Sequence, residues 1–117
     1  MDQEKFSELV AKAIDNLPAE FLDLVENVDI VVEDTPTPEQ LDKTESGSLL
    51  GLYEGVPLTV RTTGYNMVLP DKITLFQKPI ETICRNDDEV YSQIQMTVKH
   101  EIAHHFGISD ERLDELE

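Results

Sequence analysis

The C-terminal third of the chain contains one long amphipathic segment. From residue 89 to about residue 106, apolar side chains recur every four positions, which is the period of one face of an α-helix. Asn86, Asp87 and Asp88 each have a side chain that can cap the first turn of this helix. The apolar face consists of Val90, Ile94, Val98 and Ile102. A helix with one apolar face needs a second layer of structure to bury it.

The rest of the chain provides that second layer. Helical spacing predicts a helix over residues 3–17, and Pro18 suits the first position of a further helical turn over 18–28. Another short helical turn is expected after Pro79, over residues 80–84.

Strands are expected in the middle of the chain, where β-branched residues are frequent. In chain order we expect a strand over 28–34, a polar surface loop over 35–48, two short strands about a Glu54–Gly55 turn in 49–61, irregular chain over 62–68 and a strand over 69–77. Ile73 and Leu75 face the same way in the last strand. These elements predict an α+β fold of two layers, formed as a single domain by residues 1–117.

Charge and cysteine content restrict the possible partners and the cellular setting. The chain has 9 Lys and Arg against 25 Asp and Glu, so its net charge is 9 − 25 = −16. Such a surface repels phosphate, so neither nucleic acid nor an anionic membrane is expected as a partner; solubility is the simplest role of the charge, and an acidic docking surface is the alternative. Cys84 is the only cysteine, which excludes an intramolecular disulfide and a Cys-rich zinc site, and it suits a small core residue better than a reactive thiol. With no signal peptide and no bilayer-spanning apolar run in the sequence, we expect a cytoplasmic protein.

All three histidines lie within six consecutive positions of the long helix. His100, Glu101 and His104 form an H-E-x-x-H pattern. Imidazoles four residues apart share one helix face, about 5–6 Å apart at Cβ, so both can reach one zinc ion at about 2.0–2.1 Å. Glu101 projects about 100° round the helix from His100, where it can flank the ion as a general base without binding it. His105 projects away from His104 and is interpreted as a packed residue or a partner of a ligand.

A glycine follows the expected end of this helix. Gly107 can adopt the left-handed conformation that turns the chain sharply. The turn can bring Asp110 to the ion as a third protein ligand; alternatively, Asp110 or Ser109 caps a last helical turn. Three protein ligands leave one place of a tetrahedral zinc site open for water, which is typical of catalytic sites. The reaction indicated is metal-assisted hydrolysis of an amide bond.

A peptidase also needs groups that stabilise the oxyanion and a place for an extended peptide. The candidate donors, for each of which a structural role is the commoner alternative, are Tyr53, Tyr65, Tyr91, Arg61 and His105. An exposed edge strand within residues 51–58 could pair with the backbone of a substrate.

Three stretches together resemble a known family. HEIAHHFGISD is similar to the extended zincin motif H-E-x-x-H-x-x-G-x-x-D, and LLGLYEGVPLTVR and LPDKITLFQKPIE resemble the small bacterial zincin-like metallopeptidases, or minimal zincins. The resemblance runs from about Ile30 to the C-terminus. It implies a zincin-like α+β fold with a small mixed sheet packed against an N-terminal helix and a long metal-binding helix. It also implies Zn²⁺ held by His100, His104 and Asp110, Glu101 as the catalytic base, and a peptide substrate.

Two departures from larger zincins concern the surroundings of the metal. No methionine turn follows Asp110, and no sizeable second subdomain is present to wall a cleft. The leading hypothesis is a zinc-dependent metallopeptidase that acts on peptides or unfolded protein segments. The second is a non-catalytic zinc-binding or protein-interaction module that retains the motif, and the third is a structural domain with incidental histidines. The sequence indicates no particular oligomeric state.

Overall fold

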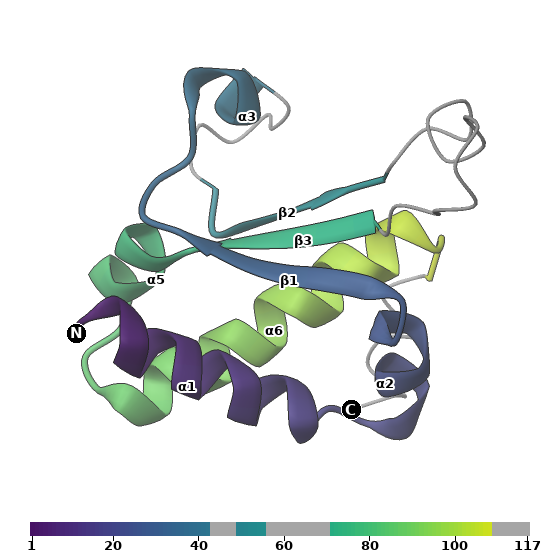
Figure 1. The fold of residues 1–117 in the computed structure, drawn as a ribbon, viewed down its shortest axis with the longest axis horizontal. Helices are drawn as coiled ribbons and strands as arrows, with labels where there is room; N and C mark the ends of the chain where they lie inside the picture. The colour runs from purple at the N-terminus through teal and green to yellow at the C-terminus, as the bar shows by residue number, and fades with distance from the viewer. Residues whose placement is uncertain (43–48, 56–70, 109–117) are drawn as a thin grey trace.

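Helices pack against one face of a small sheet in the computed structural model, which describes residues 1–42, 49–55 and 71–108 (Figure 1). In chain order the elements are α1 (Gln3–Asp15), α2 (Ala19–Val25), β1 (Val28–Glu33), α3 (Pro38–Asp42), β2 (Gly51–Glu54), β3 (Asp71–Phe76), α5 (Gln77–Ile83) and α6 (Asp87–His105). The sheet forms one layer, and α1, α2 and α6 form the other. This arrangement confirms the predicted α+β fold. Within the described ranges, no helix has the length and apolar character needed to cross a bilayer.

The sheet is mixed, with β3 between the two other described strands in the order β1-β3-β2. β1 runs parallel to β3 and β2 runs antiparallel to it, so that Ile73 lies between Ile30 on one side and Tyr53 on the other. A parallel pair needs a crossover connection, and α3 and β2 lie on that connection. The second short strand expected within 49–61 and the irregular chain over 62–68 fall largely or wholly in 56–70, outside the described residues.

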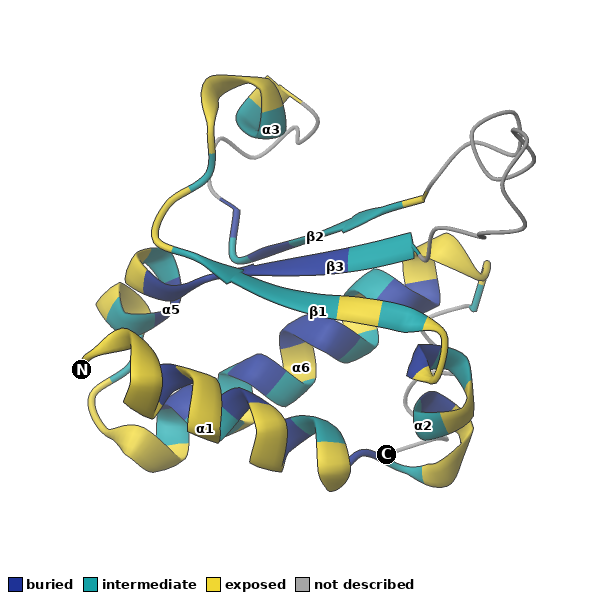
Figure 2. Ribbon diagram, viewed as in Figure 1, coloured by how far each residue is buried: buried dark blue, intermediate teal, exposed yellow. Residues whose placement is uncertain are grey.

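Buried residues lie on the facing sides of the two layers (Figure 2), and their apolar side chains form one core cluster. The predicted stripe of α6 is confirmed, because Val90, Ile94, Val98 and Ile102 are all at most 3% exposed. Ile73 and Leu75 lie in the same core. Thr74 and Phe76 are also fully buried, so the C-terminal half of β3 is covered on both faces. The other core members are Phe6, Val10, Ala13, Leu17, Phe21, Val25, Ile80 and Ala103.

The start of α6 is held by a side-chain cap. Of the three candidate caps, Asn86 has this role, and its side-chain oxygen accepts a hydrogen bond from the Glu89 N–H at 2.9 Å. The helix therefore begins at Asp87, two residues before the predicted start. Three acidic residues in the first turn add a favourable interaction with the helix dipole.

The end of α6 follows the predicted glycine turn. The helix ends at His105, and Gly107 has a φ of 69°, in the left-handed region. The Gly107 N–H donates to the His104 carbonyl at 3.4 Å, and the Ile108 N–H donates to the Ala103 carbonyl at 2.8 Å. These two bonds form a Schellman motif, which satisfies the last helical carbonyls and turns the chain away from the helix axis.

The prediction of a surface loop over 35–48 is wrong in part, because α3 forms a short helix at Pro38–Asp42. Its first turn is a capping box: the Gln40 N–H donates to Thr37 Oγ1 at 3.1 Å, and the Thr37 N–H donates to Gln40 Oε1 at 2.8 Å. Pro38 is tolerated because the first helical N–H has no partner within the helix. The prolines that indicated a loop therefore mark the start of a helix.

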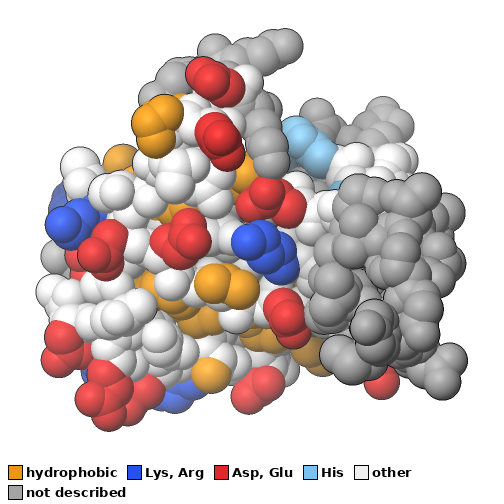
Figure 3. All heavy atoms as spheres, turned by 45° about the horizontal axis from the view of Figure 1, so that its top comes forward, with side chains coloured by type: hydrophobic (Ala, Val, Ile, Leu, Met, Phe, Trp, Pro, Cys, Tyr) orange, Lys and Arg blue, Asp and Glu red, His pale blue; other side chains and the backbone are white. Residues whose placement is uncertain are grey.

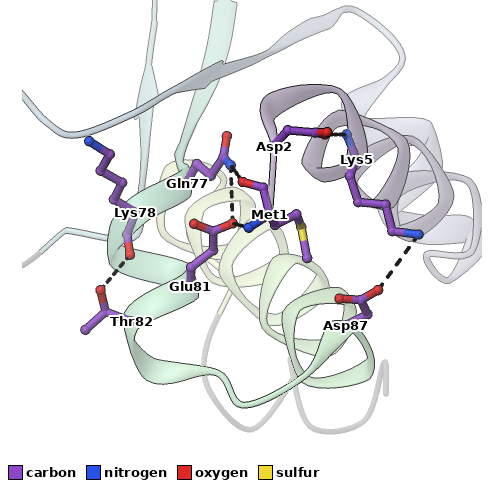
Figure 4. Close-up of polar contacts among 8 residues, drawn as sticks. All are labelled: Met1, Asp2, Lys5, Gln77, Lys78, Glu81, Thr82 and Asp87. Atoms are coloured by element: carbon purple, nitrogen blue, oxygen red, sulfur yellow. Dashed lines mark hydrogen bonds and ion pairs between the residues drawn. The ribbon is translucent and has the colours of Figure 1, made fainter.

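The short helical turn expected over 80–84 begins earlier, since α5 starts at Gln77 directly after β3. Pro79 lies inside its first turn, where backbone N–H groups have no helical partners. The start of α1 is fastened beside it (Figure 4): the Met1 ammonium lies 3.5 Å from Glu81 Oε1, and Gln77 Nε2 donates to the Met1 carbonyl at 2.9 Å. These contacts fix α1 against α5.

Cys84 packs against the core and is half-buried, in keeping with a packed residue. Burial, and to a smaller extent the negative charge of Glu89, raises the pKa of the Cys84 thiol. Less thiolate is then present at a given pH, so we expect iodoacetamide to alkylate the folded protein at pH 7.5 more slowly than the urea-unfolded protein. Glu89→Gln should speed alkylation of the folded protein. Equal rates for folded and unfolded chains would contradict this prediction.

Candidate metal centre

His100 and His104 lie on the exposed side of the last two turns of α6, opposite the buried Ile102. Their ring centroids are 6.3 Å apart and their planes make an angle of 76°. Histidine side chains reach the molecular surface on the face drawn in Figure 3, where Asp and Glu outnumber Lys and Arg. The spacing of four residues therefore brings the two imidazoles together as predicted.

The two rings lie about 1 Å farther apart than a shared zinc ion requires. A ring whose nitrogen binds zinc at about 2.0–2.1 Å has its centre about 3.2 Å from the ion, so two rings bound to one tetrahedral ion lie about 5 Å apart. The observed distance between the ring centroids is 6.3 Å. Both side chains are exposed, so rotations about their torsions can bring the rings closer together. Neutral imidazole is also a preferred zinc ligand.

The third predicted ligand, Asp110, lies outside the described residues, as does the helical turn expected after it. Within residues 1–42, 49–55 and 71–108, no group of three His, Cys, Asp or Glu side chains is placed to hold a metal ion. The Schellman motif at Gly107 supplies the turn on which the prediction for Asp110 depends. The ligand role of Asp110 stays a prediction.

Glu101 is held by a strand that lies 48 positions earlier in the sequence. Its Oε1 accepts a hydrogen bond from the Tyr53 backbone N–H at 2.8 Å, and the side chain is half-buried. The Phe76 N–H bonds to the Leu50 carbonyl, so alternate residues of β2 turn their backbone groups toward β3. Tyr53 is an odd number of residues from Leu50, so its N–H points away from β3. At that outer edge of β2, the N–H donates to Glu101. An added strand could bond to this N–H only by displacing Glu101, which limits the predicted pairing of a substrate with β2.

The contacts between helix α6 and strand β2 recur at regular intervals along both elements. A Cβ built on Gly51 would lie 2.6 Å from Thr97 Cγ2, and one built on Gly55 would lie 3.5 Å from His105 Cε1. Between them, Tyr53 bonds to Glu101. Two strand residues advance about 6.6 Å and four helix residues about 6 Å, so every second strand residue meets every fourth helix residue. The close approach at Gly51 therefore sets the position of Glu101.

We expect Gly51→Ala to destabilise the protein by about 1–3 kcal/mol, because the new Cβ would overlap the Thr97 methyl group. Adding Thr97→Ser, which removes that methyl group and keeps the hydroxyl that Gln93 contacts, should restore part of the loss. Urea unfolding of the double-mutant cycle measures the coupling. Gly55→Ala is the matched control, because its Cβ would meet nothing closer than 3.5 Å. Equal losses at both glycines would refute the close approach.

His105 points away from the histidine pair and packs on β2, one of the two roles that the sequence indicated. Its ring stacks on Tyr53 with centroids 3.9 Å apart and an interplanar angle of 16°. The Tyr53 hydroxyl donates to Asp71 Oδ2 at 2.7 Å, and His105 Nε2 lies 3.8 Å from the same oxygen. Asp71 was not predicted at the site, because nothing local in the sequence distinguishes the first residue of β3.

Of the remaining candidate donors, the structure describes Tyr91 alone. Arg61 and Tyr65 are outside the described residues. Tyr91 lies about two and a half helical turns before His100, and its hydroxyl accepts a hydrogen bond from Gln95 Nε2 at 3.3 Å. Tyr91 therefore has a structural contact within α6.

The fold and the site define a zincin-like protein, in which a long helix beneath a small mixed sheet presents H-E-x-x-H near its C-terminal end. The zincin-like metallopeptidase family matches residues 25–117, and the chain belongs to this family. Its fold is similar to that of a conserved hypothetical protein from Thermus thermophilus, with a TM-score of 0.56 at 21% identity over 91% of this chain and 94% of that one. A comparison with curated proteins found no match.

Proposed function

We propose that the protein is a zinc-dependent metallopeptidase that hydrolyses peptides or unfolded protein segments. Membership of the zincin-like metallopeptidase family supports this reaction class. The observation that carries most weight is the position of Glu101. A hydrogen bond from the Tyr53 backbone holds its side chain, and it follows His100, a member of the exposed imidazole pair, in the sequence. A carboxylate beside a metal-binding pair is what general-base catalysis of hydrolysis requires.

His100 and His104 would hold the ion through their ring nitrogens, with Asp110 as the proposed third ligand. When bound, zinc supplies a Lewis acid and lowers the pKa of water toward about 7. Glu101 would accept the proton of the attacking water on Oε2, since Oε1 already accepts the Tyr53 N–H. The hydrogen bond fixes the orientation of the carboxylate and so limits the reorganisation needed for proton transfer.

The expected setting follows from charge and cysteine content. A net charge of −16 disfavours nucleic acid and anionic membranes as partners. We expect the protein to act in the cytoplasm on peptide substrates.

Digestion of a quenched fluorescent peptide library by the full chain tests the proposal. We expect cleavage by protein loaded with one zinc ion per chain, loss of cleavage after chelation, and recovery after zinc is added back. Zinc binding without cleavage of any library member would favour a non-catalytic zinc-binding module. A purified chain that neither contains zinc nor gains thermal stability when zinc is added would overturn the metal site itself.

A further inference from the structure

Three side chains from three elements meet beside Glu101: Tyr53 of β2, Asp71 of β3 and His105 of α6. We call this group the Tyr53 clamp. The Tyr53 ring contacts both others: its face lies against the His105 ring with centroids 3.9 Å apart, and its hydroxyl donates to Asp71 Oδ2 at 2.7 Å. The Asp71 side chain is only 15% exposed, which strengthens its polar contacts. The Tyr53 ring is therefore fixed on one face and at its tip.

The clamp and the Glu101 contact share one residue. The Tyr53 N–H bonds to Glu101, and the Tyr53 ring packs on His105, which lies four positions later on the same helix. Tyr53 thus contacts two successive turns of α6, once through its backbone and once through its side chain. A ring held at its face and at its tip restricts χ1 and χ2 of Tyr53, and this limits how far the Tyr53 backbone can move near the end of a four-residue strand.

We propose that Tyr53, Asp71 and His105 are positioning residues for the carboxylate of Glu101. This inference rests on the proposed function, in which Glu101 is the general base. The clamp keeps the Tyr53 N–H where it donates to Oε1, which fixes the orientation of the carboxylate and leaves Oε2 as the oxygen that would accept the proton. A base that is misplaced by about 1 Å can lose about 100-fold in rate, so such a device affects turnover more than binding.

Tyr53→Phe and His105→Ala test the clamp in the full chain. Tyr53→Phe keeps the stacked ring and removes the bond to Asp71, whereas His105→Ala removes the stack. We expect kcat for a library-derived peptide to fall about 10- to 100-fold in each variant, with KM changed less than about twofold. Zinc affinity should be retained, because His100 and His104 are untouched. Tyr91→Phe, which removes a tyrosine hydroxyl from a contact elsewhere on α6, is the control.

Hydrogen exchange of the Tyr53 amide gives a readout that does not depend on activity. In the wild type this edge N–H should be protected by its bond to Glu101, and each clamp variant should lower the protection about tenfold or more, as expected for loss of a hydrogen bond to a charged group. Asp71→Asn, which can still accept the Tyr53 hydroxyl bond, should retain more protection and more kcat than Asp71→Ala.

Two results would overturn the clamp: unchanged protection of the Tyr53 amide in its variants, or lost protection with kcat unaffected. The failure of the clamp and the failure of the proposed function are distinguishable. A wild-type chain that binds zinc and cleaves nothing refutes the function, while the exchange measurement alone still decides whether the clamp holds the contact with Glu101.

Discussion

Glu101→Gln is expected to lower kcat for peptide hydrolysis by about 10²- to 10⁴-fold, the usual contribution of a general base. An amide oxygen is too weakly basic to take a proton from water at neutral pH. The substitution is otherwise conservative, because the glutamine Oε1 can still accept the Tyr53 N–H now bonded at 2.8 Å. Zinc affinity and unfolding free energy should therefore stay close to those of the wild type. Steady-state kinetics measures kcat, and zinc competition on the same preparations measures the zinc affinity.

Glu89→Gln is the matched control for this prediction. It makes the same chemical change in the first turn of the same helix. In that turn, Glu89 Oε1 accepts a hydrogen bond from the Arg85 N–H at 3.2 Å. We expect its kcat to equal that of the wild type. Full activity in Glu101→Gln would exclude Glu101 as the base and leave the family membership intact.

Removing either imidazole of the pair should lower zinc affinity at least about 100-fold. Loss of a residue that merely supports a ligand costs about 10- to 100-fold, and loss of a ligand should cost at least as much. His100 and His104 both lie on the exposed side of α6. The unfolding free energies of His100→Ala and His104→Ala without zinc should therefore differ little from that of the wild type. Competition with a chromophoric chelator measures the affinity. Ser92→Ala, another exposed position of α6, is the control.

Asp110→Ala separates the two roles that the sequence left open for this residue. A ligand role predicts a large loss of zinc affinity. A helix cap predicts unchanged affinity and a loss of about 1 kcal/mol in stability.

If His100→Ala and His104→Ala both bound zinc as tightly as the wild type, the metal centre would have to be sought elsewhere in the chain.

Local patterns predicted the elements that depend on neighbouring residues. The buried face of α6, a cap among Asn86, Asp87 and Asp88, and the left-handed turn at Gly107 were all predicted from side chains a few positions apart. Helix α3 was missed although its capping box is equally local, because the prolines beside Thr37 were interpreted as loop formers. The start of α5 was predicted too late for the same reason, because Pro79 lies inside its first turn. Proline is compatible with the first turn of a helix as well as with a loop, so its presence alone does not decide between them.

The sequence by itself determined which face of α6 carries the histidine pair, because helical spacing places His100 and His104 together wherever the helix lies. Only the tertiary structure decided what holds Glu101 and what His105 contacts. The partner of Glu101 lies 48 positions away, and the two meet because the absence of a side chain at Gly51 lets β2 approach α6 closely. A contact of that kind depends on how two layers pack, and no periodicity along the chain encodes it.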